Sequence, residues 1–590
     1  RLYEGPIEIN KTTTVNFIAV LPGVCESYES TQALRSQYSQ VKITIKNGLY
    51  DIVFDSKGGS NIPSLTKVKA GSLIDKPEDP TKLDFIFDGW YKDEKYTKAW
   101  DFTADKVTGD TTLYAKWSRD VTAAPAPYGA LPSEQQMRYY EEELAGFVHY
   151  GPNTYKGTNG IEWGNDGTYT PDTMQYPDTI DTDQWVETFK NAGFKRLIFT
   201  AKHHDGFRLF DTDEFSTAQS KNGKDILALL SASCTKYNMN MGLYLSPWDV
   251  FEEKGKSIVY GERGAYGNGS GSTDSSPLDD DYNILYEKHL REIFDNPKYG
   301  NNGEFVELWL DGANGSGLKQ LYDFPVWLDI AKGSNGVQDT RDEMIVYGPP
   351  YVSGKDAAWC GNEKGEIDPN KPSTMTPGTG PTEPIPDPAA ESEWVVWEGD
   401  FSIRPGWFYH PNENGKVKTG EYLLDRYMQT VGQGGIMLLN IPPNRNGLID
   451  DIDVENLNEF ARLREETFGE GKNLARGSNV TATSEKVRSE RFSASNLVDG
   501  DYDTYWTMAD EERQGTVIID LGQPKTFDVV ELQEYIPLGQ RIDAYQVEVF
   551  VNGQWQEFSK GTVVGYRKMS TNQPVKTDKL RITVSSENAV

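Results

Sequence analysis

Cysteine, histidine and long apolar runs are all scarce in this chain of 590 residues. The three cysteines, Cys25, Cys234 and Cys360, lie far apart, which excludes a disulfide-rich scaffold and a cysteine-based zinc site. No apolar run reaches the length that crosses a bilayer, so we expect no transmembrane segment. The chain begins at Arg1 without the apolar core of a signal peptide, so we expect any targeting peptide to have been removed or to lie outside this sequence.

Basic residues are also scarce relative to acidic ones, with 59 Lys and Arg against 90 Asp and Glu, so the formal net charge is −31. An acidic surface repels phosphate backbones, so nucleic acid is not expected as a partner. Aromatic residues are plentiful, with 14 Trp, 32 Tyr and 24 Phe, which is typical both of β-rich cores and of surfaces that stack on sugars. The chain is too long for one hydrophobic core, so we expect several domains.

The sequence predicts a multidomain protein, in which a (β/α)8-type barrel is flanked by small all-β domains and a C-terminal β-sandwich. Residues 1–48 hold short β-type runs and resemble the second half of the small β-sandwich that accompanies chitobiase-type enzymes, without its first strands. Residues 49–118 contain GWY, WDF and TLYAKW in that order and resemble an internalin-type B-repeat, which is a β-grasp-like unit. An Ala/Pro-rich stretch at 121–130 marks a domain boundary.

Residues 127–470 alternate between apolar, strand-like runs and amphipathic stretches. The apolar runs include GFVHY, RLIFTA, MGLYLS, FVELWLD and MIVYG, and amphipathic stretches cover 182–192, 226–237 and 282–294. Repeated βα units of this kind predict a (β/α)8-type barrel. A doubly wound sheet is the alternative, but no Gly-rich phosphate loop follows any of the strands.

Polar and aromatic residues gather where these strands end, which is the edge at which barrel enzymes place their active sites. Of the five histidines in the chain, three fall there. Histidine pairs bind zinc, but adjacent histidines on a strand point apart and no third ligand stands at metal-site spacing, so hydroxyl recognition is favoured and no catalytic cofactor is expected. The strand-end residues are His149, His203, His204, Tyr244, Trp309 and Asp311.

A series of motifs spread over about 340 residues carries a family resemblance. In chain order they are FVHYGPNTY, IEWG, KHHDGF, GLYLSPWD, ELWLDGANG, WCGNEKG, SIRPGWFYH and MLLNIPPNRNGLI. Together they resemble family 29 α-L-fucosidases. The resemblance implies removal of terminal α-L-fucose by a retaining double displacement, with fucosylated oligosaccharides or glycoconjugates as partners. The WCGNE and SIRPGWF elements are similar to the branch that prefers α-1,3- and α-1,4-linked fucose in Lewis-type glycans.

A retaining glycosidase needs two carboxylates, of which one is the nucleophile and the other switches between acid and base. Asp311 follows a continuous apolar strand and is our candidate nucleophile, with a helix cap as the structural alternative. The resemblance places the acid/base at Glu363, where the adjacent Trp359 is expected to exclude water and to raise the carboxyl pKa. Two other carboxylates stay open for this role, Glu366 and Glu398.

The same resemblance implies a set of fucose-binding residues that surround the two carboxylates. Imidazoles and a carboxylate bond to adjacent hydroxyls, and Trp faces pack against C–H groups. For Trp163 and Trp407, core packing is an equal alternative. The implied set is His149, Glu162, Trp163, His203, His204, Tyr244, Trp309, Glu398, Arg404 and Trp407. A departure from the family pattern is the Pro-rich stretch 364–393, with seven Pro between Pro369 and Pro388, which is expected to shape the leaving-group side.

Residues 472–590 return to an all-β pattern and resemble a discoidin-like sandwich. The stretch LQEYIPLGQRIDAYQVEVF is similar to the C-terminal sandwich that family 29 fucosidases often carry, and we expect one or two further strands beyond Val590. The segment VDGDYDTYW resembles the calcium-binding turn of discoidin folds, and Asp499, Asp501 and Thr504 offer hard oxygen ligands for a structural Ca²⁺. An Asp-rich turn held by its own backbone bonds is the alternative.

The B-repeat resemblance predicts that the protein is bacterial and is secreted, periplasmic or attached to the cell surface. Two other functions stay open at this point. One is a surface glycan-binding protein with an inactive barrel, which the presence of both candidate carboxylates disfavours. The other is a hydrolase of a related sugar such as α-L-galactose, which differs from fucose by one hydroxyl.

Overall fold

The computed structural model divides the chain into two compact units, Arg1–Ala124 and Pro125–Val590. In the segment 1–48 it describes one antiparallel pair, β1 (Thr13–Phe17) with β2 (Ser39–Ile43), together with residue 48. The rest of the sandwich predicted there lies outside the described residues. The structure further describes residues 49–82, 85–119, 124–156, 162, 169–213, 215–249, 251, 280–311, 322–333, 344–348, 354–375, 392–486, 490–509 and 512–587.

The first unit contains a small four-stranded sheet in the order β4-β3-β6-β5. Its strands β3 and β6 are parallel, and the other neighbours are antiparallel. The ring of Trp90 is buried and meets the ring of Phe54 edge-on at 4.9 Å, so aromatic packing forms the core of this unit. The strands are β3 (Leu49–Asp55), β4 (Leu65–Lys69), β5 (Phe85–Tyr91) and β6 (Thr111–Arg119).

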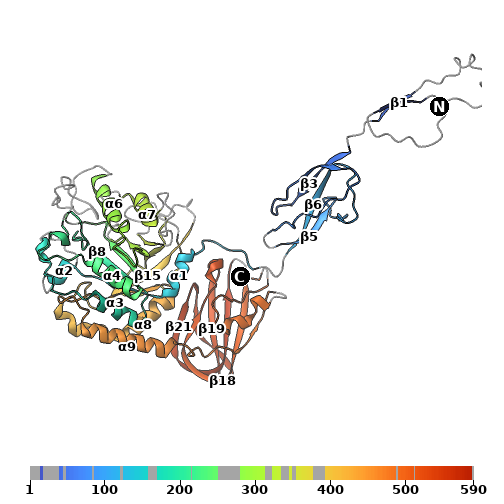
Figure 1. The fold of residues 1–590 in the computed structure, drawn as a ribbon. Helices are drawn as coiled ribbons and strands as arrows, with labels where there is room; N and C mark the ends of the chain where they lie inside the picture. Colours follow the sequence, from blue (N-terminus) through green and yellow to red (C-terminus); the bar gives the residue numbers. More distant parts are fainter. Residues whose placement is uncertain are drawn as a thin grey trace, which may run out of the picture. The chain divides into compact units, whose positions relative to one another are not determined.

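The second unit is built on a closed barrel of eight parallel strands, which confirms the predicted fold class. Each barrel strand pairs with the next barrel strand along the chain, and the last pairs with the first to close the ring. Figure 1 shows helices packed around these strands. The strands are β7 (Leu144–Val148), β8 (Arg196–Lys202), β9 (Asn240–Leu245), β10 (Glu307–Trp309), β11 (Ile345–Tyr347), β12 (Ala357–Trp359), β15 (Val396–Ser402) and β16 (Ile436–Asn440).

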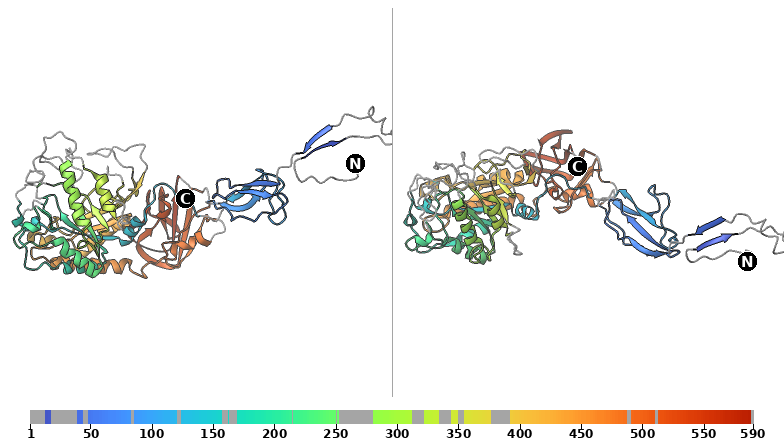
Figure 2. Two further views of the ribbon diagram at one scale, coloured as in Figure 1. Left: turned by 45° about the horizontal axis from the view of Figure 1, so that its top comes forward. Right: turned by 90° about the horizontal axis from the view of Figure 1, so that it is seen from above.

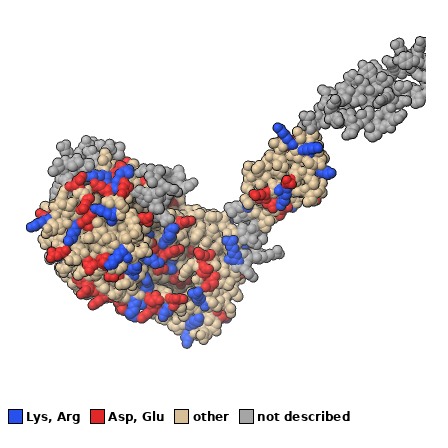
Figure 3. Space-filling model, viewed as in Figure 1, with Lys and Arg blue, Asp and Glu red and all other residues tan. Residues whose placement is uncertain are grey.

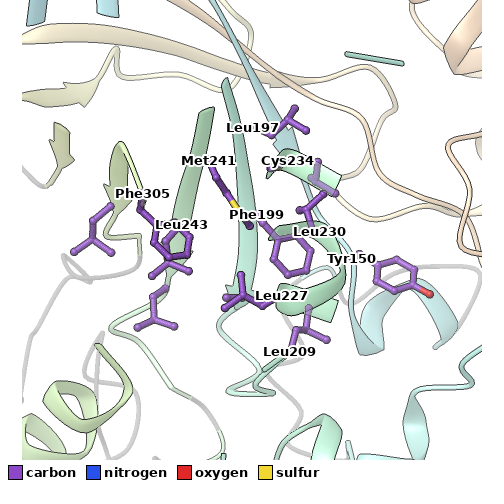
Figure 4. Packing of buried hydrophobic residues seen from close by; sticks show 14 of the residues in the cluster. Tyr150, Leu197, Phe199, Leu209, Leu227, Leu230, Cys234, Met241, Leu243 and Phe305 are labelled. Carbon is purple, nitrogen blue, oxygen red and sulfur yellow. The ribbon is translucent and has the colours of Figure 1, made fainter. Parts of the chain in front are cut away.

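Helices cover the outside of the barrel because their apolar faces bury against the strands. Figure 4 shows Leu227 and Leu230 of α4 beside Phe199 of β8 and Met241 of β9. Helix α4 begins where the Asp225 carboxylate accepts the amide of the first turn. The helices are α1 (Glu134–Glu142), α2 (Pro152–Tyr155), α3 (Thr182–Asn191), α4 (Ile226–Tyr237), α6 (Asp280–Phe294), α7 (Phe324–Lys332), α8 (Gly420–Thr430) and α9 (Asp451–Phe468).

The described residues between β12 and β15 contain no α-helix. An irregular segment, 360–375, follows β12 and ends in a short strand β13 (Thr374–Met375), which pairs with β14 (Glu393–Trp394). Gly365 turns this segment back over the barrel with φ of +66°, and a Cβ at this position would lie 2.4 Å from the Phe401 ring. Glycine therefore allows the close approach of the segment to β15.

The C-terminal domain is a five-stranded antiparallel sheet in the order β17-β18-β21-β19-β20, and it lies beside the barrel (Figures 1 and 2). Two irregularities in the register of β18 with β21 break these long strands, and all five strands contribute to one apolar core. The ring of Tyr566 stacks on Tyr140 of α1 at 4.6 Å, so the two domains share an interface. The strands are β17 (Asn479–Ala482), β18 (Gln514–Leu532), β19 (Ala544–Val551), β20 (Gln554–Gly561) and β21 (Lys568–Ser585).

Acidic side chains are spread over the face drawn in Figure 3, where they are mixed with Lys and Arg. None of the helices that the structure describes has the length and apolar character needed to cross a membrane.

Candidate active site

Asp311 lies two residues after the end of β10, at the carboxyl edge of the barrel. Its Oδ2 accepts a hydrogen bond from the hydroxyl of Tyr244 at 2.8 Å, and the Nε2 of His204 lies 3.3 Å from the same oxygen. The side chain keeps 40% of its surface exposed. A carboxylate that is oriented by two polar groups and keeps part of its surface exposed has the geometry of a nucleophile.

Three histidines form one cluster next to this carboxylate, as their positions at strand ends predict. The ring of His203 lies 4.3 Å from that of His204 and 5.6 Å from that of His149, between centroids. Burial lowers the pKa of His149 to about 4 and that of His203 well below its usual value. Both rings are therefore neutral near pH 7, and a neutral imidazole offers one donor and one acceptor to a ligand.

The tautomer of His149 follows from its partner Asn440, which ends strand β16. The amide nitrogen of Asn440 donates to Ser402 Oγ and to the carbonyl of Trp407, so its oxygen faces His149. The distance from that oxygen to Nδ1 of His149 is 2.8 Å. His149 therefore carries its proton on Nδ1, and Nε2 is the acceptor.

Aromatic rings form the floor beneath these groups. Trp309 stacks on Tyr347 at 3.7 Å and on Tyr244 at 5.5 Å, and Phe147 meets it edge-on at 5.0 Å. Tyr244 therefore contacts both the floor and Asp311. Aromatic pairs of this kind contribute stability beyond the area that they bury, so the rings of the floor stabilise one another.

Glu398 is placed differently from its predicted role as a sugar ligand or acid/base. It is fully buried behind the floor, where its carboxyl group accepts hydrogen bonds from Trp309 Nε1 at 2.6 Å and from Tyr139 at 2.9 Å. Burial and the adjacent carboxylate of Glu307 raise its pKa well above the usual value. The prediction of direct sugar contact is wrong, because Glu398 lies too deep in the barrel and supports Trp309 from below.

The structure also corrects the predicted role of Arg404 in the pocket wall. Its guanidinium has no exposed surface, donates to Asp453 of α9 at 2.8 Å and to Asn414 at 2.9 Å, and so does not form a pocket wall. A buried cation needs carboxylate and carbonyl partners, and these partners hold it inside the fold. Glu366, a rival for the acid/base role, pairs with Arg426 on the surface.

Glu363 lies on the segment 360–375, with its side chain partly exposed. Burial raises its pKa, the negative charge of Asp311 raises it further, and a hydrogen bond from the Trp407 side chain lowers it. The two carboxyl groups thus lie close enough to interact. A carboxyl with a raised pKa keeps its proton to a higher pH than an ordinary glutamate does, and is thereby suited to protonate a leaving group.

Glu162 holds the segment that carries Trp407. Its Oε2 accepts the amides of Trp407 and Phe408 at 3.0 Å each, and its Oε1 lies 2.9 Å from Nε2 of His410. The ring of Trp407 in turn lies 5.1 Å from that of His149. Trp163, which was predicted beside Glu162, lies outside the described residues.

Three polar residues of the site were not predicted, namely Asp400, His410 and Asn440. Asp400 lies two positions after Glu398 on β15, is almost fully buried, and accepts a hydrogen bond from Trp359 Nε1 at 2.8 Å. Burial and the charge of Glu363 raise its pKa well above the usual value. The alternation of side chains along the run EGDFS is the signal that places both carboxyls on one face of the strand.

The predicted calcium residues lie in one exposed turn of the C-terminal domain. The hydroxyl of Thr504 lies 2.7 Å from Asp499 Oδ2 and 3.0 Å from the carbonyl oxygen of Asp501, so three oxygens converge. The amide of Asp501 also donates to Asp499 Oδ1. These bonds match the self-stabilised turn that was the alternative, and the donor set also suits Ca²⁺. Calcium binding here stays a prediction.

The buried position of Glu398 leads to a first expected result. Glu398→Ala leaves Trp309 and Tyr139 without acceptors, and each buried group left unpaired costs about 1–3 kcal/mol. We therefore expect a clearly lower unfolding temperature in scanning calorimetry, together with reduced kcat. Glu398→Gln keeps the volume and one acceptor oxygen and should lie much closer to the wild type. Equal unfolding temperatures for the Ala variant and the wild type would contradict the supporting role.

A closed (β/α)8 barrel with two interacting carboxyl groups and a histidine cluster at its carboxyl edge defines the class of glycoside hydrolases. The protein-family model Alpha-L-fucosidase matches residues 87–465. The chain therefore belongs to the α-L-fucosidase family, family 29 of the glycoside hydrolases. The Listeria-Bacteroides repeat domain matches residues 50–116, and the F5/8 type C domain matches residues 479–590, which confirms the two flanking resemblances.

Relatives with known names and structures agree with this family. The chain is 32% identical over 461 residues to Alpha-L-fucosidase 1 of Arabidopsis thaliana, covering 75% of this chain and 82% of that protein. The structure of a Ruminococcus gnavus GH29 fucosidase in complex with fucose is similar with a TM-score of 0.68 and 35% identity, over 79% of this chain and 94% of that one. The crystal structure of SpGH29 gives a TM-score of 0.66 and 36% identity, over 79% and 97%.

Proposed function

We propose that this fucosidase is a retaining enzyme, with Asp311 as the nucleophile and Glu363 as the acid/base. The observation that carries the proposal is the asymmetry of the two carboxyls. Asp311 is oriented by Tyr244 and His204 and suits attack as an anion, whereas Glu363 has a raised pKa and suits proton donation. Opposite environments for two nearby carboxyls are typical of glycosidases that form a covalent intermediate.

In the proposed first step, Asp311 Oδ attacks the anomeric carbon of fucose while Glu363 protonates the departing glycosidic oxygen. The C–O bond to the leaving group breaks and an ester bond to Asp311 forms. In the second step Glu363 removes a proton from water, and the water oxygen replaces Asp311 at the anomeric carbon. His149, His203 and Trp407 surround this space and are proposed to bind the sugar hydroxyls and the C–H face.

The substrates are proposed to be α-1,3- and α-1,4-linked fucose in Lewis-type branched glycans. Support comes from the two sequence elements that resemble this branch, because the structure brings both to one place. WCGNE carries Glu363, SIRPGWF carries Trp407, and the Trp407 side chain donates to Glu363. Residues 376–391 of the Pro-rich stretch, predicted to shape the leaving-group side, lie outside the described residues.

The protein is further proposed to act outside the bacterial cell or on its surface. The match to the Listeria-Bacteroides repeat supports this location, since a 72-residue stretch is 49% identical to part of a protein named Putative Gly-rich membrane protein of Evansella cellulosilytica. An inactive glycan-binding barrel is disfavoured, because both carboxyls and the histidine cluster stand together at the barrel edge.

A panel of fucosylated oligosaccharides tests the linkage and the stereochemistry separately. We expect kcat/KM for α-1,3- and α-1,4-fucosylated trisaccharides to exceed that for α-1,2- and α-1,6-linked fucose by about ten-fold or more. Proton NMR during turnover of an aryl α-L-fucoside should show α-fucose as the first anomer. An equal rate on all linkages would refute the substrate proposal alone, and β-fucose as the first product would refute the retaining mechanism.

A further inference from the structure

The segment that carries Glu363 lies between the barrel and the C-terminal domain. We refer to residues 360–375 as the acid/base segment. On the barrel side, its Cys360 amide donates to the carbonyl of Glu398 at 3.0 Å, and its Ile367 amide donates to the carbonyl of Gln429 at 2.9 Å. These two bonds hold the start and the middle of the segment. Its last third contacts the barrel domain through Trp397, which donates to the carbonyl of Pro372, and through the Val395 amide, which donates to the carbonyl of Ser373, and it contacts the C-terminal domain as well.

Three residues of the C-terminal domain bind that last third. Lys568 at the start of β21 donates to the carbonyl of Pro369. The hydroxyl of Thr562 lies 2.9 Å from Asn370 Oδ1, and Gln540 Oε1 accepts the amide of Ser373 at 3.0 Å. The three residues come from separate parts of the sandwich and converge on residues 369–373. The three contacts therefore join Lys568 to Pro369, Thr562 to Asn370, and Gln540 to Ser373.

Lys568 is the best fixed of the three. It is buried, with 2% of its surface exposed, and its ammonium also donates to Gln433 Oε1 of the barrel at 3.0 Å. Gln433 in turn donates to the carbonyl of Met569, so the ammonium is held by both domains. A buried ammonium needs its acceptors, because an unpaired charge in the interior is strongly unfavourable. The position of the Pro369 carbonyl is therefore coupled to the packing of the two domains.

The turn that carries Glu363 lies a few residues before Pro369 in the same segment. Asn362 Nδ2 donates to the carbonyl of Glu366 at 2.7 Å, and its Oδ1 accepts the amide of Lys364 at 3.0 Å. Residues 362–366 are thus closed on themselves by these bonds, and Glu366 also pairs with Arg426 of α8. A displacement at Pro369, three residues further on, would act on this turn along the chain and so on the position of the Glu363 carboxyl.

We propose that the C-terminal sandwich positions the acid/base, with Lys568 as the principal positioning residue. This inference rests on the proposed role of Glu363. A general acid acts only within hydrogen-bond reach of the oxygen that it protonates, so a small displacement lowers the rate. The sandwich is then a working part of the catalytic site, whether or not it also binds sugar.

The test uses a series of aryl α-L-fucosides whose leaving groups differ in pKa, from 2,4-dinitrophenol to phenol. A poor leaving group needs the proton from Glu363 and a good one does not. Lys568→Met should lower kcat/KM for phenyl fucoside about ten-fold and change that for dinitrophenyl fucoside less than about two-fold. The dependence of rate on leaving-group pKa therefore becomes steeper, which a general loss of folded protein does not produce.

Arg567→Gln is the matched control, since Arg567 lies next in the chain, is buried at the same interface and pairs with Glu143 and Glu531, which lie outside the acid/base segment. It should leave the steepness unchanged. If Lys568→Met does not fold, Gln540→Ala combined with Thr562→Ala removes two neutral contacts and should show the same trend.

Glu363→Ala is measured beside these variants. The dependence of kcat/KM on leaving-group pKa should be steep in Glu363→Ala. If it is steep there but stays as in the wild type in Lys568→Met or in the double variant, the positioning role alone is overturned. A shallow Glu363→Ala would instead overturn the acid/base assignment on which the inference rests.

Discussion

Replacing Asp311 with Asn is expected to lower kcat/KM by about 10³-fold or more on every fucoside, including those with good leaving groups. An amide has nearly the shape of the carboxylate and is a far weaker nucleophile, so the covalent step fails while the pocket persists. Tyr244 donates to Asp311 Oδ2, and the amide oxygen of Asn keeps this acceptor. The folded structure should therefore be retained, and the loss should appear in kcat.

Steady-state kinetics on 2,4-dinitrophenyl α-L-fucoside measures this change, with calorimetry as the check on folding. Asp520→Asn is a suitable control, because this half-exposed residue of β18 pairs with Lys579 in the C-terminal domain. It should leave kcat/KM within about two-fold of the wild type, in line with other surface substitutions. Near-native turnover by Asp311→Asn would rule out its role as the nucleophile.

Removal of Glu363 is expected to separate substrates by their leaving groups. Glu363→Ala should reduce fucose release from an oligosaccharide by about 10²–10⁴-fold, because a sugar alkoxide cannot leave without a proton. The first step with dinitrophenyl fucoside needs no such proton and stays fast. Its second step then limits turnover, since no base activates the attacking water.

Added azide should accelerate that second step, because a small anion needs no general base. The expected product is α-fucosyl azide, formed by two successive inversions at the anomeric carbon. Glu366→Ala is a close control, since Glu366 lies three residues away in the same segment and pairs with Arg426 at the surface. Equal damage to both substrates by Glu363→Ala, without azide rescue, would show that Glu363 positions the sugar instead.

Much of the site followed from the ends of the predicted strands. A side chain just after an apolar run must emerge at the carboxyl edge of a parallel barrel, whatever the outer helices do. This argument predicted that His149, His203, His204 and Asp311 would meet, and the distances between the rings agree with it.

Depth along a strand was not predictable in the same way. Glu398 and Asp400 share the inward face of β15 by simple alternation, yet Glu398 lies at the level of Ile436 and Asp400 at the level of Leu438. The register of neighbouring strands sets these levels, and it depends on pairing between distant segments. Sequence patterning therefore predicted the face that Glu398 points to, and missed that it lies below the floor.

Long-range ion pairs set a similar limit. Arg404 stands in a motif beside Trp407, which made it a candidate for the pocket wall. Its partner Asp453 lies 49 residues further on, and the docking of α9 brings the two together. In the same way, the contacts of Lys568 with the acid/base segment span about 200 residues. Local spacing contains no information on such pairs.

The most direct test of the retaining mechanism is to trap its covalent intermediate. In 2-deoxy-2-fluoro-α-L-fucosyl fluoride the anomeric fluoride is a good leaving group. The fluorine on carbon 2 stays on the sugar and slows the second step, so the ester to the nucleophile should accumulate. Mass spectrometry of the digested protein is expected to find one fluorofucosyl group per chain, on Asp311. Labelling of a different carboxylate, or turnover of the reagent without any labelled protein, would contradict the account.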